Sequence, residues 1–151
     1  MEAHGKVTEL FTLHNKQANA LFWSPRGKLI VLAGLKACFG GKLEFFDVER
    51  KQTIRVQQHL KANNVVWDPS GRYVATAFTI PQEEFDESYG QVGDPLERFH
   101  VWSSSGDFLY YHQCDYPLIQ MDWRPYRGGI IDDDLVQKRK KFLVETAESW
   151  F

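Results

Sequence analysis

The chain has 151 residues, of which 43% are hydrophobic and 25% charged, with a formal net charge of −2 at pH 7. This composition is typical of about one soluble globular domain. No apolar run approaches the roughly 18 residues of a membrane-spanning helix and no signal segment opens the chain, so we expect a cytoplasmic protein.

The charges are unevenly distributed along the chain. Residues 1–75 carry 11 Lys and Arg against 6 Asp and Glu, whereas residues 76–131 carry 3 against 9. A basic face of the first part can contact nucleic acid through phosphate groups, or its charges can simply be solvated. The sequence leaves both interpretations open.

A phrase containing tryptophan, proline and glycine recurs along the chain. Its full copies are ALFWSPRGKLIV at 20–31 and NVVWDPSGRYVA at 64–75, and a partial copy, LIQMDWRP, follows at 118–125. The full copies lie 44 residues apart, within the roughly 40–45 residues of a four-stranded propeller blade. The repeat predicts an all-β chain of WD40-like β-propeller blades over residues 1–127, forming the C-terminal part of a larger propeller.

Short apolar runs separated by turn residues predict four strands in each unit. We expect strands near 19–23, 29–35, 42–47 and 53–57, then near 64–67, 73–79, 98–103 and 108–112. The run 118–123 would open a third unit, and 7–13 would be the outer strand of a preceding blade. Runs such as 29–33 are apolar at every position, which predicts sheets covered on both faces.

The second unit contains 12 additional residues, all between Ile80 and Glu97. Because blades stack through their strands, we expect this insertion to be a loop. It is rich in acidic residues and is either a solvated loop or a partner contact through Phe85 and Tyr89.

Trp23, Trp67 and Trp123 occupy equivalent positions, so they predict packing in the blade cores rather than stacking on nucleic-acid bases. We extend this expectation to Trp102.

From Ile131 the pattern changes to that of an amphipathic helix, which follows a hinge at Gly128-Gly129. Residues 128–151 are therefore predicted to be a hinge and a C-terminal partner-binding helix. An apolar stripe with large aromatic residues favours docking on another chain, although folding back on the propeller remains open. The expected partner-binding residues are Leu135, Arg139, Phe142, Leu143, Ala147, Trp150 and Phe151.

The sequence contains no pattern typical of a catalytic, cofactor or metal site. Cys38 and Cys114 lie outside any ligand spacing and are expected to be reduced and partly buried. The histidines are expected to be surface or strand residues rather than ligands: His4, His14, His59, His100 and His112. We therefore expect no cofactor, no metal and no enzymatic activity.

The segments NALFWSPRG (19–27), IVLAGL (30–35), VWDPSGRYV (66–74), VW (101–102) and WRP (123–125) resemble the last blades in the b-subunit family of eukaryotic translation initiation factor 3. The match in order and spacing extends along nearly the whole chain. The resemblance implies a propeller on the small ribosomal subunit that supports 43S preinitiation complex assembly. It also implies a C-terminal helix that binds the i and g subunits, and contact with the a subunit.

Two other functions remain as alternatives. One is a related single-chain propeller factor that delivers initiator tRNA, which shares WxPxG phrases. The other is a generic WD40 interaction scaffold. An RNA-recognition domain before the propeller would favour the b-subunit hypothesis, and a propeller that starts at the N-terminus would favour the single-chain factor.

Overall fold

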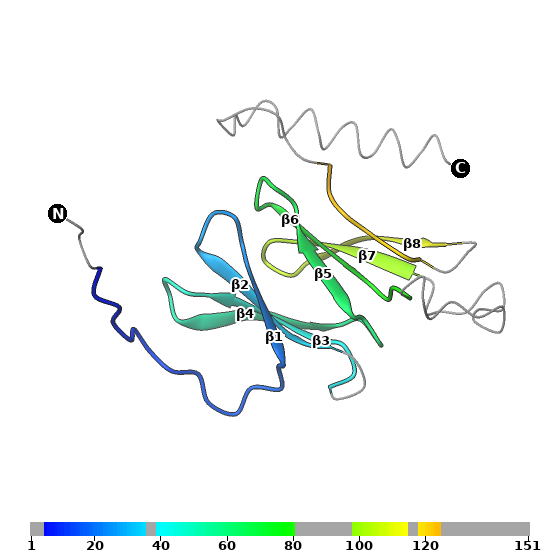
Figure 1. The fold of residues 1–151 in the computed structure, drawn as a ribbon. Coiled ribbons are helices and arrows are strands. Elements are labelled where there is room, and N and C mark those ends of the chain that lie inside the picture. Colours follow the sequence, from blue (N-terminus) through cyan, green and yellow to red (C-terminus); the bar gives the residue numbers. More distant parts are fainter. Residues whose placement is uncertain (1–4, 36–38, 81–97, 115–117, 125–151) are drawn as a thin grey trace.

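The computed structural model describes residues 5–35, 39–80, 98–114 and 118–124. Within these ranges the chain forms two four-stranded antiparallel sheets (Figure 1). The first contains β1 (Ala20–Trp23), β2 (Leu29–Gly34), β3 (Lys42–Asp47) and β4 (Gln52–Gln58). The second contains β5 (Asn64–Trp67), β6 (Tyr73–Ala77), β7 (Arg98–Ser103) and β8 (Phe108–Gln113). Each sheet is a meander, because strands consecutive in the chain are neighbours.

The prediction of an all-β chain with four strands in each unit is confirmed for the described residues. β3, β5 and β7 have the predicted bounds, and the other five differ by one or two residues at an end. The structure has no strand at 7–13, so the prediction of an outer strand there is wrong, and residues 118–123 also form no strand. A strand needs a neighbour to complete its hydrogen bonds, and the sheets that these segments would join are not among the described elements. The insertion and the predicted C-terminal helix lie outside the described residues.

The repeated phrase forms the same tight turn in both units. The amide of Gly27 donates to the Ser24 carbonyl, and the amide of Gly71 donates to the Asp68 carbonyl, each over 2.8 Å. The two glycines have φ values of 74° and 72°, a conformation that glycine adopts at no steric cost. This explains why glycine follows proline by two residues in both full copies.

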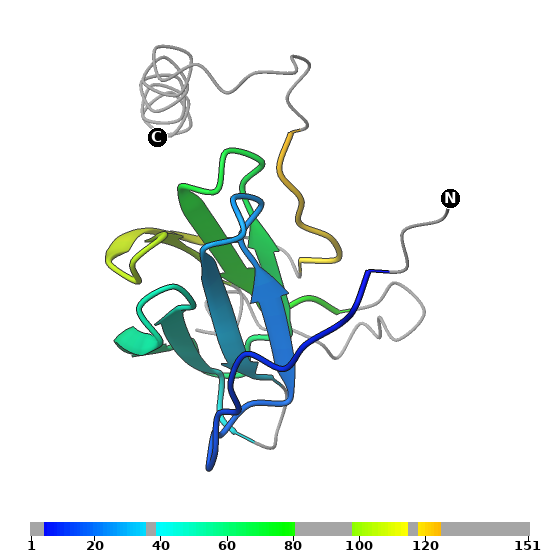
Figure 2. The ribbon, with the colours of Figure 1, turned by 90° about the vertical axis from the view of Figure 1, so that its left-hand side faces the viewer.

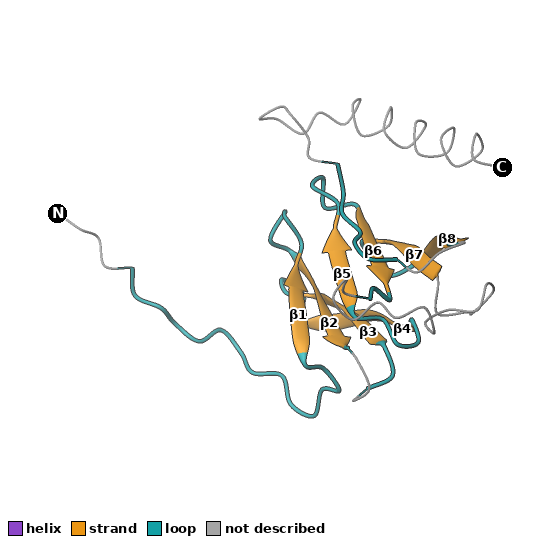
Figure 3. Ribbon diagram, turned by 45° about the vertical axis from the view of Figure 1, so that its right-hand side comes forward, coloured by secondary structure: helices purple, strands orange, loops and turns teal. Residues whose placement is uncertain are grey.

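The two sheets stack as successive blades do, with β1 beside β5 (Figures 2 and 3). The first sheet contributes Val31, Ala33, Leu43 and Phe45 to the main core, and the second contributes Val65, Val74 and Trp102. A second cluster on the other side of the first sheet contains Ile30, Leu32 and Phe46. Both faces of β2 are therefore covered, as its unbroken apolar run predicts.

The segment before β1 contributes to the second cluster. Phe11 and Ala18 pack against it, and the rings of Phe11 and Phe46 are 6.0 Å apart. Val7 and Leu10 in the same segment are exposed. The N-terminal segment thus covers the outer face of the first sheet only in part.

Candidate functional site

The partner-binding residues predicted from the sequence all belong to the C-terminal segment, and they lie outside the described residues. They are Leu135, Arg139, Phe142, Leu143, Ala147, Trp150 and Phe151. The structure describes instead the joint between the two blades and the surfaces on either side of it.

Two tryptophans join successive units through main-chain carbonyl groups. Trp67 Nε1 donates to the carbonyl oxygen of Phe22 over 2.8 Å, and Trp123 Nε1 donates to that of Val66 over 2.9 Å. In both cases the acceptor is the residue immediately before the tryptophan of the preceding unit. Because an indole N–H taken out of water needs a partner, the repeated tryptophan acts as a joint between neighbouring units.

The burial of the tryptophans differs from the prediction. Trp67 packs against the main core and is partly buried, as expected, but Trp23 is 52% exposed. The most buried described tryptophan is Trp102, at 2% exposure. The prediction of core packing is thus wrong for Trp23. At the equivalent position Trp67 contacts the preceding unit, and the described residues contain no sheet before Trp23.

A buried polar network connects the loop after β4 to the second sheet. His59 Nδ1 lies 2.8 Å from Thr76 Oγ1, and Trp102 Nε1 donates to the same oxygen over 2.9 Å. The His100 ring stacks on His59, with centroids 3.8 Å apart and planes 8° from parallel. The sequence-based expectation of a surface or strand position is wrong for His59, which is 3% exposed and lies in a loop.

The surroundings of His59 favour its neutral form. The Thr76 hydroxyl accepts the Trp102 indole N–H and forms a second hydrogen bond with His59 Nδ1. Burial, reinforced by the neighbouring His100, lowers the pKa of His59 to about 4. His59 is therefore neutral near pH 7, and its hydrogen bond with Thr76 links the loop to β6.

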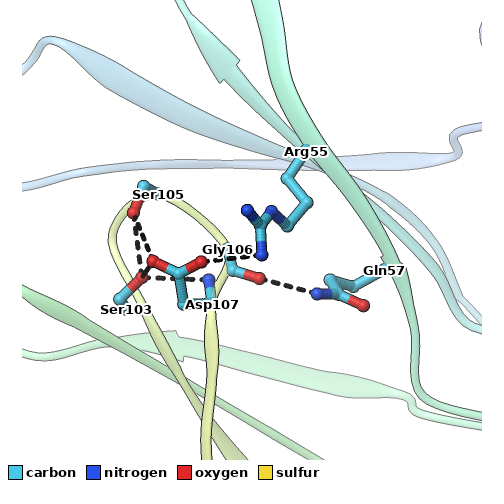
Figure 4. Close-up of polar contacts among 6 residues, drawn as sticks. All are labelled: Arg55, Gln57, Ser103, Ser105, Gly106 and Asp107. Atoms are coloured by element: carbon cyan, nitrogen blue, oxygen red, sulfur yellow. Dashed lines mark hydrogen bonds and ion pairs between the residues drawn. The ribbon is translucent and has the colours of Figure 1, made fainter.

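The outer strand of the first blade reaches the β7–β8 turn of the second (Figure 4). Arg55 forms an ion pair with Asp107, with 2.7 Å between nitrogen and oxygen, and Gln57 Nε2 donates to the Gly106 carbonyl over 2.9 Å. Gly106 has a φ of 89°, and a Cβ at this position would lie 2.7 Å from Cδ2 of Phe45. The turn can approach the first blade this closely because residue 106 has no side chain.

The same turn is held by its own side chains (Figure 4). The hydroxyl groups of Ser103 and Ser105 donate to Asp107 Oδ2 over 3.2 and 3.1 Å, and the Asp107 amide donates to Ser103 Oγ over 3.0 Å. These bonds orient the carboxylate that Arg55 meets. Both members of the ion pair are about half exposed, so the pair contributes at most about 1 kcal/mol and serves mainly to align the two blades.

Many cations of the basic first unit contact other groups of the chain. These contacts are Lys16 with Glu44, Arg26 with the Ser70 carbonyl, Lys42 with Gln17, Lys51 with the Phe11 ring and Arg55 with Asp107. These side chains are therefore already engaged within the chain, whereas nucleic-acid binding would need their charges for contacts with phosphate groups. The described part of the first unit therefore favours internal roles for much of its basic charge.

Glu44 is a buried carboxylate on the face that the N-terminal segment covers. Burial opposes its ionisation, but hydrogen bonds from Lys16 and Thr53 and the charges of Lys16 and Lys42 outweigh this effect and hold its pKa below the usual value. Glu44 thereby ties the segment before β1 to the first sheet.

Among the described residues, no group of three or more His, Cys, Asp and Glu side chains is arranged to hold a metal ion. Cys114 is half-buried and reduced, as predicted, while Cys38 lies outside the described residues. The described elements include no helix of the length and apolarity needed to cross a membrane.

A protein-family profile described as "Eukaryotic translation initiation factor eIF2A" matches residues 3–120, which is more than half of the chain. The chain belongs to this family. Among curated proteins, this eIF2A-family chain is similar to the B subunits of eukaryotic translation initiation factor 3 from several organisms. It is 44% identical to the Nicotiana tabacum protein over 92% of this chain, and 33% identical to the Xenopus laevis protein over 93%.

These relatives confirm the resemblance to the b-subunit family that the sequence motifs predict. The chain spans 18–19% of the length of the curated relatives it matches. A solved structure, "Crystal structure of the eukaryotic initiation factor", is similar over 74% of this chain and 25% of that chain, with a TM-score of 0.58 and 20% identity. At this identity the likeness concerns the fold alone, and it agrees with the two blade-like sheets of this eIF2A-family chain.

Proposed function

We propose that the chain forms blades of a larger propeller in a b-type scaffold subunit of translation initiation factor 3. In this role it acts in the cytoplasm, without catalysis, on the small ribosomal subunit and supports 43S preinitiation complex assembly. The observation that carries the proposal is the 44% identity to a B subunit of this factor over 92% of the chain. The blade joints support it, because they are typical of a rigid frame rather than of a reactive site.

We assign partner binding to the C-terminal segment. Its predicted stripe contains Phe142, Leu143, Trp150 and Phe151, and such aromatic residues are typical anchors of a helix that docks in a groove. The proposed partners are the i and g subunits, with further contact to the a subunit. Contact with ribosomal RNA is weak or indirect in this proposal.

The test is a pull-down with the full chain as bait and purified i and g subunits as prey. We expect Phe142→Ala and Trp150→Ala to reduce recovery at least about tenfold, as loss of an interface anchor does. Lys141 is not one of the residues of the predicted stripe, so Lys141→Ala serves as the matched control and should bind as the unsubstituted chain does. Equal recovery by all four baits would exclude this role of the helix.

The name of the matched family supports a second candidate, the single-chain propeller factor that delivers initiator tRNA. The two candidates differ in their ligands. Binding of initiator tRNA by the full chain, without binding of the i and g subunits, would favour the second. Co-sedimentation with small ribosomal subunits at rising salt tests the ribosome contact separately, and its absence even at low salt would count against that contact.

A further inference from the structure

A cluster of aromatic rings runs from the buried polar network to the surface of β8. His59 stacks on His100, and the Phe108 ring stands edge-on to Trp102 and His100, with centroids 5.3 and 5.5 Å apart. Phe108 also stacks with Tyr111, with centroids 6.2 Å apart and planes 28° from parallel. His59 and Trp102 are buried, whereas Phe108 and Tyr111 are 49% and 51% exposed.

The two exposed rings lie on the face of the second sheet that is turned toward the first sheet. In the pairing of β7 with β8, Phe108 is opposite Trp102 and Tyr111 is opposite His100. Residues directly opposite each other share a face of the sheet, and Trp102 packs in the core between the two sheets. A unit stacked on the other face of the second sheet would therefore leave both rings uncovered.

β8 is the edge strand of its sheet, and it has no charged side chain of the kind that often protects such an edge. Its sequence, FLYYHQ, contains no Lys, Arg, Asp or Glu, and Leu109 is 49% exposed as well. Contiguous exposed apolar side chains are typical of an interaction site. The surface formed by Phe108, Leu109 and Tyr111 is here named the β8 patch.

The charges around the β8 patch favour a cationic partner. Residues 76–131 carry 3 Lys and Arg against 9 Asp and Glu, and Asp107 and Asp115 stand on either side of β8 in the sequence. Arg55, the cation of the blade joint, is paired with Asp107 over 2.7 Å, so it opposes an incoming cation only weakly. The phosphate groups of a nucleic acid would meet repulsion from the acidic residues.

We infer that the β8 patch is a docking site for an arginine-bearing segment of a partner protein. The faces of aromatic rings attract cations, and a guanidinium group stacks on them better than an ammonium group because it is planar and more weakly hydrated. The apolar side chain of Leu109 adds contact for the residues beside the arginine. The patch is separate from the C-terminal segment, to which binding of the i and g subunits is assigned, so it gives the blades a partner of their own.

The test is an NMR titration of the full chain with a synthetic peptide that carries one arginine between two leucines, with Gly-Ser ends. We expect this peptide to shift the amide signals of β8 and the indole N–H signal of Trp102, whose ring contacts Phe108. A peptide with lysine in place of arginine should bind at least about twofold more weakly. Tyr111→Leu and Phe108→Leu should each weaken binding of the arginine peptide about two- to fivefold, as loss of an exposed cation–π contact does.

Two variants separate loss of the ring from other effects. Phe39→Leu removes a ring that is 37% exposed in the loop before β3, and it should bind the arginine peptide as the original chain does. Tyr111→Trp keeps an aromatic ring and should bind at least as tightly as the original chain, which excludes general damage to the sheet as the cause.

A hexamer of uridine tests the alternative of base stacking and should leave the β8 signals unchanged. Four results would each overturn the inference: no shift of the β8 signals by the arginine peptide, equal binding of the arginine and lysine peptides, equal binding by Tyr111→Leu and Phe39→Leu, or binding of the uridine hexamer at β8.

Discussion

The Thr76 hydroxyl group connects the buried network, because its oxygen is hydrogen-bonded to both Trp102 and His59. Thr76→Val keeps the shape of the side chain but removes the acceptor of the Trp102 indole and the hydrogen-bond partner of His59 Nδ1. Thr76 is fully buried and Trp102 is 2% exposed, so water cannot easily replace the lost partner. Each unsatisfied buried group costs about 1–3 kcal/mol, so the two groups together give a loss of about 2–6 kcal/mol in the free energy of unfolding.

The loss can be measured by urea denaturation. With an m-value of about 2 kcal/mol/M, the midpoint should fall by about 1–3 M, which corresponds to a large part of the stability of a small domain. Thr76→Ser separates the causes, because it keeps the hydroxyl and removes only a methyl group, at a cost of about 1 kcal/mol. Thr8→Val, at an exposed position, should change the midpoint little. If Thr76→Val is no more destabilising than Thr76→Ser, the hydroxyl does not hold the network.

Three further predictions concern the network and the blade joint. The free energy of unfolding should fall by about 3 kcal/mol between pH 7 and pH 4, because His59, with a native pKa of about 4, resists protonation over most of this range while the unfolded chain takes up a proton below about 6.5. His59→Gln should flatten this dependence in urea titrations, and an equally steep dependence in the variant would contradict the assignment. Gly106→Ala should lower the free energy of unfolding by about 1–3 kcal/mol in calorimetry, because alanine is strained at this φ and its Cβ would meet Phe45. An unchanged Tm would show that the turn can move away. Trp67→Phe removes the donor to the Phe22 carbonyl and should cost about 1–3 kcal/mol in urea denaturation, whereas Trp67 variants that unfold at the original midpoint would show that the joint is not stabilising.

Local signals predicted the strands because they act over a few residues. The turn after each tryptophan needs a residue with positive φ two positions after the proline, which glycine provides. The runs on either side of this turn have the length and apolarity of buried strands. The positions of Gly27 and Gly71 therefore located the strand boundaries to within one or two residues. The same local signals failed at 7–13, because strand formation there requires a neighbouring sheet that those residues do not themselves provide.

Burial and partnership of side chains were decided only by the stacking of the two sheets. Trp23 and Trp67 are equivalent in the sequence, yet within the described ranges Trp67 meets a strand of the preceding unit and Trp23 is 52% exposed. His59 contacts Thr76 from 17 residues away, and no local pattern marks a loop histidine as part of a buried network. The sequence by itself determined the repeat, its turns and the family resemblance, since these are properties of neighbouring residues. The tertiary structure decided which polar groups pair, because those bonds form only when one blade lies against the next.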